Sequence, residues 1–150
     1  MKIKIPPPIV AWIFAGLMYL SDRVLPVGEF DFFGRDYLIY GLTVLGGFVL
    51  AASMLRFFIS RTTLNPFSPE RASRLVTKGL YKFSRNPMYL ALLLFLLAWG
   101  LWLGNAFNTL LAAGFVSYMN RFQILHEEKA LTQRFGKEYQ LYCKNVRRWF

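Results

Sequence analysis

The sequence predicts an all-α integral membrane protein with four membrane-spanning helices, a cytoplasmic loop and a C-terminal amphipathic helix. Three observations predict this fold class. The chain of 150 residues is 55% apolar and 18% aromatic, which exceeds the usual range of soluble domains. Charged residues are absent from 37–55 and from 86–120, whereas a helix needs only about 20 residues to cross the hydrocarbon core. The remaining Lys and Arg lie mainly in two segments beside these runs, as the positive-inside rule expects.

The first two spans are expected at residues 6–25 and 37–59. The first is expected to be a retained helix rather than a cleaved signal peptide, because Ser21, Asp22 and Arg23 follow its apolar stretch and more apolar spans come later. Residues 21–36 between the two spans carry four acidic residues and two arginines, so we expect this segment on the outer side. Small residues in the second span, including Gly46, would allow close approach of a neighbouring helix.

Residues 60–86 are predicted to be a basic cytoplasmic loop. It contains the helix breakers Pro66 and Pro69, and its basic residues are Arg61, Arg71, Arg74, Lys78, Lys82 and Arg85. A membrane hairpin should follow, with spans at 87–103 and 106–125 and a tight turn at Gly104 and Asn105.

Residues 127–150 are predicted to form a cytoplasmic amphipathic helix, because apolar side chains recur there at intervals of three or four. These side chains are Leu131, Phe135, Tyr139 and Tyr142. The loop 60–86 and this helix flank the hairpin, so both should lie on one face of the membrane and form a pocket there. We therefore expect a protein of the cytoplasmic or inner membrane, with both termini on the cytoplasmic side.

The net charge of +10 does not indicate nucleic-acid binding, because the charges flank the apolar spans and no nucleic-acid-binding module is visible. Cys143 is the single cysteine, so the chain contains no internal disulfide. We expect no metal cluster either. Membrane lipids are the expected surroundings, and the sequence leaves the oligomeric state open.

Three groups of residues are candidates for chemistry, and each also has a purely structural interpretation. The first extends from Leu75 to Tyr89, where Gly79 suits a turn, Pro87 suits the start of a helix and the tyrosines suit the membrane interface. The second is the pair Glu127 and Glu128, which is either a solvated helix turn or the lining of a polar pocket. The third is the aromatic and basic segment 135–149, which also suits a helix at the membrane surface.

Together the order and spacing of these groups resemble the isoprenylcysteine carboxyl methyltransferase family and its phospholipid methyltransferase relatives. The resemblance covers about residues 62–149. The matching residues before the hairpin are Leu75, Val76, Gly79, Tyr81, Arg85, Asn86, Pro87 and Tyr89. The matching residues after it are Glu127, Glu128, Leu131, Phe135, Gly136, Glu138, Tyr139 and Tyr142.

The resemblance implies a methyltransferase that takes its methyl group from S-adenosyl-L-methionine at the cytoplasmic side and passes it to a lipid-like or small amphiphilic acceptor. The implied cofactor-binding residues are Arg74, Leu75, Val76, Gly79, Tyr81, Arg85, Asn86, Pro87, Tyr89, Glu127, Glu128 and Tyr139. Arg121 and Glu128 are the implied catalytic residues. By charge, the glutamates suit the amine or ribose of the donor and Arg85 its carboxylate. Tyr81, Leu75 and Val76 suit its adenine.

Two positions depart from the family pattern. Asn86 stands where the isoprenylcysteine enzymes have histidine, and Gln123 occupies the place of an arginine near the acceptor carboxylate, with Arg121 two residues earlier. The identity of the acceptor therefore stays open. Two other functions also stay open: an NADPH-dependent membrane reductase with a similar C-terminal architecture, and a non-enzymatic membrane module with the same fold.

Overall fold

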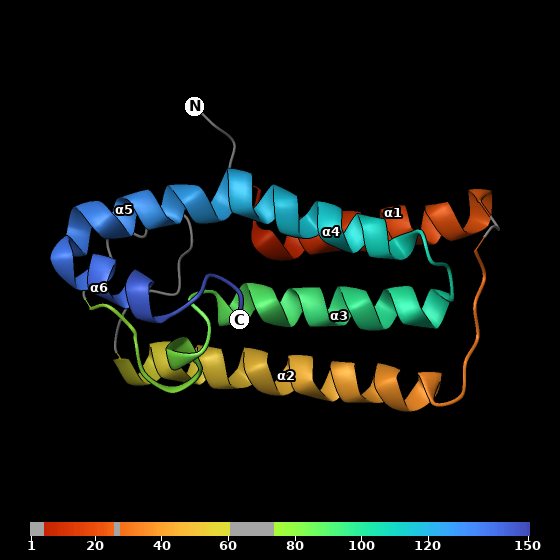
Figure 1. Cartoon of the computed structure of the whole chain (residues 1–150), viewed down its shortest axis with the longest axis horizontal. Coiled ribbons are helices and arrows are strands. Elements are labelled where there is room, and N and C mark those ends of the chain that lie inside the picture. The colour runs from red at the N-terminus through yellow and green to blue at the C-terminus, as the bar shows by residue number, and fades with distance from the viewer. Residues whose placement is uncertain (1–4, 26–27, 61–73) are drawn as a thin grey trace.

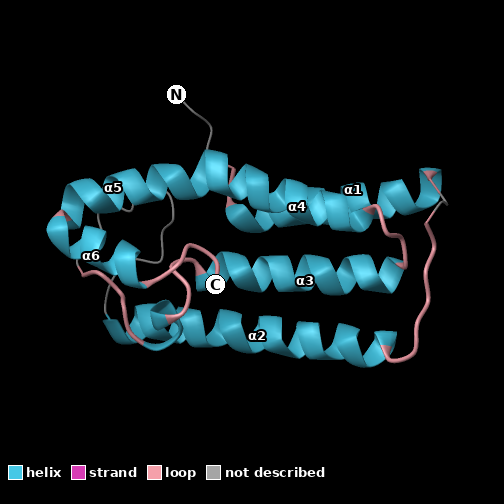
Figure 2. Cartoon of the chain, in the orientation of Figure 1, coloured by secondary structure: helices cyan, strands magenta, loops and turns pink. Residues whose placement is uncertain are grey.

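The computed structural model of the chain describes residues 5–25, 28–60 and 74–150. Every regular element within these ranges is a helix, as Figure 2 shows, and the extended pairing there is a single bridge between Glu29 and Asn105. The predicted all-α class is therefore confirmed for the described residues. Residues 61–73 of the predicted loop 60–86 lie outside the described ranges. They include Arg61, Pro66, Pro69 and Arg71.

Four long helices form the body of the molecule. They are α1 (Pro7–Val24), α2 (Arg35–Ser60), α3 (Pro87–Leu103) and α4 (Asn108–Tyr118). Figure 1 shows α3 in the middle, with α2 along one side and α1 and α4 along the other, and α3 contacts all three. The predicted helical segments 6–25, 37–59 and 87–103 agree closely with α1, α2 and α3.

Prolines and polar side chains fix where these helices begin and end. Pro87 occupies the first turn of α3, where its missing N–H has no intrahelical acceptor to lose. Gly104 ends α3 at the predicted turn, and its N–H is donated to the carbonyls of Gly100 and Leu101. The adjacent Asn105 is buried and donates its Nδ2 to the carbonyl of Leu25 at 2.9 Å, so the turn is tied to the end of α1.

The predicted boundary between the fourth span and the C-terminal helix is wrong. The chain stays helical from α4 through the π-helical segment η3 (Met119–Ile124) into α5 (Leu125–Phe135), with helical dihedral angles at each junction. The polar residues Asn120 and Gln123 lie inside η3, within this continuous helix. A π-helical turn has no simple sequence signature, because it differs from the α-helix only in its hydrogen-bond register.

The predicted single helix 127–150 is also wrong in its extent. Gly136 has a positive φ of 51°, a conformation that suits glycine, and it separates α5 from α6 (Lys137–Asn145). Val146 is extended, with φ of −128° and ψ of 130°, so residues 146–150 leave the helix. A short 3₁₀ turn, η2 (Gly79–Lys82), precedes α3.

The apolar core joins α1, α3, α4 and η3. Its buried members are Val10, Met18, Tyr89, Leu93, Leu96, Ala112, Phe115, Met119 and Ile124. Phe14 of α1 packs edge-on against Phe115, with ring centroids 5.7 Å apart. The helix α2 packs on the other side of α3, where Gly46 lies against the ring of Phe95 and allows the close approach that the sequence predicts.

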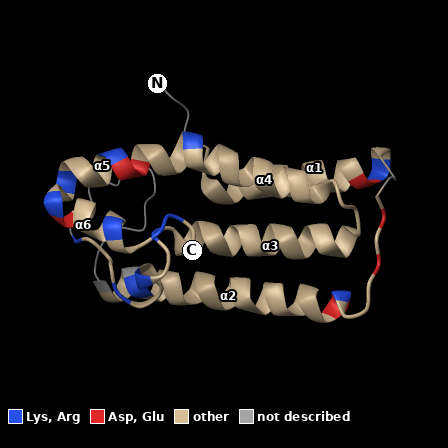
Figure 3. Cartoon of the chain, in the orientation of Figure 1, with Lys and Arg blue, Asp and Glu red and all other residues tan. Residues whose placement is uncertain are grey.

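Large apolar side chains cover much of the outer surface. Trp12 on α1 is 77% exposed and Val44 on α2 is 71% exposed, and neither is an isolated case. Soluble monomers rarely expose this many large apolar side chains on a continuous surface. Among the described residues, the segment Arg35–Arg56 is the one helix long and apolar enough to cross a membrane by length and composition, and α3 is apolar but shorter. Figure 3 shows that the middle of the bundle carries no charged residues.

Candidate active site

The candidate site lies at the end of the bundle where η2, the start of α3, α5, α6 and the C-terminal tail meet (Figure 1). The sequence predicts that Arg85 and the glutamate pair are close to one another. In the structure Nη1 of Arg85 is 3.1 Å from Oε1 of Glu128. Residues 43 positions apart in the chain are thus paired, and the predicted convergence of the two basic segments is seen at this end.

Glu128 is the centre of an ion cluster with two arginines. Besides Arg85, it accepts hydrogen bonds from Nε of Arg148 at 2.9 Å and from Nη2 of Arg148 at 2.7 Å. The Glu128 and Arg85 side chains are 17% and 14% exposed, and that of Arg148 is 32% exposed. A two-point pair of this kind fixes the orientation of both side chains. The hydrogen bonds to Glu128 raise the pKa of Arg148, against the opposing effect of burial.

The cluster carries an excess of positive charge, because two guanidinium groups face one carboxylate. Arg85 also donates from Nη1 to Sγ of Cys143 at 2.7 Å. Its Nε is buried and has no hydrogen-bond partner in the described part of the chain. A buried N–H group without a partner is costly, so this atom marks a place where an anionic oxygen would be stabilised.

Glu127 points to a different set of partners. Its Oε1 accepts a hydrogen bond from the hydroxyl of Tyr89 at 2.6 Å and another from Nε2 of Gln123. Tyr89 lies in the first turn of α3 and Gln123 is buried in η3. The two adjacent glutamates therefore do different things: Glu128 binds arginines, whereas Glu127 links α3 to η3.

Three tyrosines line the interior of the site. Tyr81 and Tyr139 are buried, and the hydroxyl of Tyr142 donates to the backbone carbonyl of Tyr81 at 2.6 Å. Burial is the largest cause that raises the pKa of all three phenols well above the usual value, and nearby Cys143 adds to it at Tyr139. These three side chains give the site an aromatic lining.

The other predicted residues before α3 have mainly structural surroundings. Gly79 has a φ of 68°, and a Cβ there would lie 2.6 Å from Nε of Arg56, so only glycine fits this turn. Leu75 and Val76 are half-buried, whereas Arg74 is exposed. Leu75 and Val76 can therefore contribute apolar surface near Tyr81. No contact of Arg74 with the ion cluster is seen in the described part of the chain.

Asn86 is turned towards the C-terminal tail. Its Nδ2 donates to the backbone carbonyl of Arg148 at 3.0 Å, and its own N–H donates to the hydroxyl of Ser84 at 3.1 Å. The position at which the family pattern has histidine thus holds the tail in this chain.

Arg121, which the resemblance implies is catalytic, has different surroundings from this cluster. It is exposed, its guanidinium lies 5.8 Å from the ring centroid of Phe122, and no ion pair of Arg121 occurs within the described ranges. Gln123 is the inward-facing polar residue of η3. The role of Arg121 stays a prediction.

Arg148 is the site residue that the sequence reasoning missed. Arg147 and Arg148 are adjacent in the sequence, and neither the charge of Glu128 nor its pairing with Arg85 indicates which of them reaches the site. Choosing between them required the path of the tail after Gly136, which only the structure gives.

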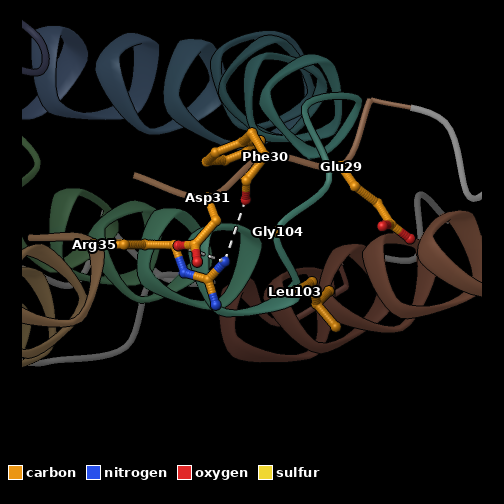
Figure 4. Close-up of a pocket in the computed structure, with 6 residues that line it drawn as sticks. All are labelled: Glu29, Phe30, Asp31, Arg35, Leu103 and Gly104. Carbon is orange, nitrogen blue, oxygen red and sulfur yellow. Dashed lines mark hydrogen bonds and ion pairs between the residues drawn. The ribbon is translucent and has the colours of Figure 1, made fainter. Parts of the chain in front are cut away.

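A pocket lies at the opposite end of the bundle and is separate from the candidate site. This pocket has a volume of about 380 Å³ and lies beside the turn between α3 and α4. Figure 4 shows the residues that line it. Its lining residues are Glu29, Phe30, Asp31, Arg35, Leu103 and Gly104. Arg35 donates from Nη1 to the carbonyl of Phe30 at 3.2 Å and lies 3.5 Å from Asp31, so these contacts hold the loop before α2.

Comparison with known proteins identifies the family. The family model described as phospholipid methyltransferase matches residues 35–138, which include α2, Arg85 and both glutamates. The chain belongs to the phospholipid methyltransferase family. The predicted resemblance is therefore confirmed, and with it the class of membrane methyltransferases.

Individual relatives of this phospholipid methyltransferase family member agree with that assignment. A probable protein-S-isoprenylcysteine O-methyltransferase of Oryza sativa subsp. indica is 26% identical over 141 residues, 92% of this chain and 72% of the rice protein. A protein-S-isoprenylcysteine O-methyltransferase of Schizosaccharomyces pombe is 28% identical over 106 residues, 71% of this chain and 45% of that protein. An uncharacterized protein of Haemophilus influenzae is 53% identical over 62 residues, 41% of this chain and 98% of that protein. No solved structure matches.

Proposed function

We propose that this chain is an integral membrane methyltransferase that uses S-adenosyl-L-methionine and methylates a lipid-like or small amphiphilic acceptor. The observation that carries the proposal is the meeting of Arg85, Glu128 and Arg148 with Glu127 at one end of the bundle. The family assignment supports the reaction class, and the chemistry of the site supports the donor.

The donor is a molecule with separated charges, and the site has matching ones. Its carboxylate suits the ion cluster, where one positive charge is in excess and Nε of Arg85 is buried without a partner. Its cationic amine suits the carboxylate of Glu127. Its adenine suits the aromatic and apolar side chains of Tyr81, Leu75 and Val76. When bound, the donor supplies a methyl group on a positively charged sulfur, so little acid or base chemistry is required of the protein.

The residues of the chain would act by orientation and by exclusion of water. The Glu128 carboxylate holds the guanidinium groups of Arg85 and Arg148 in fixed positions, and Tyr89 with Gln123 holds Glu127. Fixed alignment of reacting groups supplies much of the barrier reduction in a displacement of this kind. We therefore assign Glu128 a positioning role in place of the catalytic role that the resemblance implies.

We further propose that α1, α2, α3 and the helix from α4 into η3 cross the membrane, with the site on the cytoplasmic side. The 18 residues of α1 extend about 27 Å as a helix, close to the hydrocarbon thickness of about 30 Å. Figure 3 supports the orientation, since most Lys and Arg lie at the end with α5 and α6, whereas acidic residues outnumber basic ones at the other end. Both termini would then be cytoplasmic.

Transfer of a labelled methyl group tests the proposal. Purified protein in lipid nanodiscs would be incubated with methyl-labelled S-adenosyl-L-methionine and offered phospholipids, thiols, carboxylates and amines of amphiphilic character. Label in an extracted acceptor from wild-type protein, and none from Arg85→Ala, is the expected result. The absence of transfer to every class would refute the proposed activity and favour a non-enzymatic module with the same fold.

A further inference from the structure

We infer that the C-terminal tail completes the donor site, and that Arg148 binds the carboxylate of the donor together with Arg85. This inference rests on the proposed function and extends it to a segment that lies beyond the family match, which ends at residue 138. The tail is residues 146–150, which follow α6 without regular secondary structure and contact the segment before α3.

The first anchor of the tail is the segment just before α3. The backbone N–H of Arg85 donates to the carbonyl of Arg147 at 3.0 Å. Asn86 donates from Nδ2 to the carbonyl of Arg148 at 3.0 Å, and the hydroxyl of Ser84 donates to the same oxygen at 3.5 Å. The backbone carbonyls of Arg147 and Arg148 are thus both held by residues 84–86.

The second anchor is on η3. Nε1 of Trp149 donates to Oδ1 of Asn120 at 3.0 Å, and the indole packs against the buried apolar core. Arg148 therefore stands between two fixed points, one on each side of the site. Fixing the backbone on both sides reduces the number of side-chain positions open to Arg148 and directs its guanidinium to Glu128.

The guanidinium of Arg148 has N–H groups that do not contact Glu128. An arginine has five N–H groups, and the two contacts with Glu128 use one at Nε and one at Nη2. The side chain is 32% exposed, so a ligand can reach it. Its other three N–H groups, at Nη1 and Nη2, are not used by Glu128. With Arg85 on the other side of Glu128, the pair carries one uncompensated positive charge, which favours binding of a carboxylate.

Asn86 acquires a role in this arrangement as a positioning residue. It acts through the main chain of Arg148, because its amide is committed to that carbonyl oxygen. A histidine at this position also has a ring N–H that donates, so Asn86→His should preserve the anchor, whereas Asn86→Ala removes it.

The test compares two donors that differ only in the carboxylate. Binding of S-adenosyl-L-methionine and of its decarboxylated form would be measured by calorimetry on full-length wild-type protein, Arg148→Ala and Arg147→Ala. Arg147 is the matched control, since it is adjacent, exposed and carries the same charge. Because Arg148→Ala removes a charge-assisted contact, we expect it to weaken binding of the complete donor by about tenfold or more. Its affinity for the decarboxylated donor should stay within about twofold of wild type, as should both affinities of Arg147→Ala.

Several results would overturn the inference. Equal affinities in Arg148→Ala and Arg147→Ala would show that Arg148 does not bind the donor, and an equal loss for both donors would show a structural role only. If Arg148→Ala does not fold, Arg148→Gln replaces it, because it removes the charge and keeps a long polar side chain, and unchanged selectivity for the carboxylate would be decisive against the inference. Asn86→Ala should reduce this selectivity and Asn86→His should restore it. A wild-type protein that binds neither donor would instead refute the proposed function, and this inference with it.

Discussion

Removal of the charge on Glu128 should destabilise the protein far more than the same change elsewhere. In Glu128→Gln the side-chain size is kept, but the carboxylate between Arg85 and Arg148 becomes a neutral amide. Two guanidinium groups that are 14% and 32% exposed would then face each other with no anion between them. The chain contains a matched control in Glu138, an exposed residue of α6 at which the same substitution can be made.

The structure allows the size of the effect to be worked out. Breaking a fully buried ion pair by removing one partner costs about 3–5 kcal/mol, and exposed pairs contribute about 0–1 kcal/mol. The Glu128 cluster lies between these limits but nearer the first, so we expect a loss of about 3 kcal/mol. For a chain of this size that corresponds to a fall in Tm of roughly 6–12 °C. Glu138→Gln should cost less than about 1 kcal/mol, mainly from a weakened interaction with the start of α6.

The measurement is thermal unfolding of both variants in the same detergent, followed by tryptophan fluorescence without added ligand. Each variant loses one negative charge, so general charge effects cancel in the comparison. Equal shifts of Tm in Glu128→Gln and Glu138→Gln would refute the reasoning, because they would show that Glu128 is not held by the two arginines.

Two further predictions concern the tyrosines and the packing of α2. Burial raises the folded-state pKa of three phenols above the unfolded value of about 10, so their contribution to stability is complete below that pH and is lost as the pH rises above it. Tm should therefore fall above about pH 10, and a Tm that stays constant there would contradict the burial of Tyr81, Tyr139 and Tyr142. Gly46→Leu should destabilise the protein by about 1–3 kcal/mol, because a Cβ at Gly46 would lie 3.0 Å from the ring of Phe95. Gly47→Leu is the control, since nothing lies within 4 Å of a Cβ there, and equal unfolding temperatures of the two variants would exclude this α2–α3 contact.

The helices before the site could be predicted because residues with special backbone requirements mark their ends. Pro87 and Gly104 bound α3, and the predicted segment 87–103 has the same limits as the helix. The convergence of Arg85 with the glutamates could also be predicted, because two basic segments that flank a helical hairpin must meet at one end of it. The membrane crossings themselves and the roles of the site residues remain proposals.

The parts that could not be predicted depend on long-range geometry. The sequence does not distinguish a helix that ends near Gln123 from one that passes through a π-helical turn there, because both explain polar residues after an apolar run. It also does not assign Arg148, because its pairing with Glu128 depends on the break at Gly136 and on the two anchors of the tail. The glutamates look equivalent in sequence, yet their side chains have different partners.

The central claim is that the segment before α3 and the segment after α4 form a single site for the methyl donor. Calorimetric titration of purified wild-type protein with S-adenosyl-L-methionine, beside Arg85→Ala and Glu127→Ala, tests it most directly. We expect saturable binding in the micromolar range to wild type and its loss in both variants, one from each side of the site. Binding heat that is absent from the folded wild-type protein, or unchanged in both variants, would contradict it.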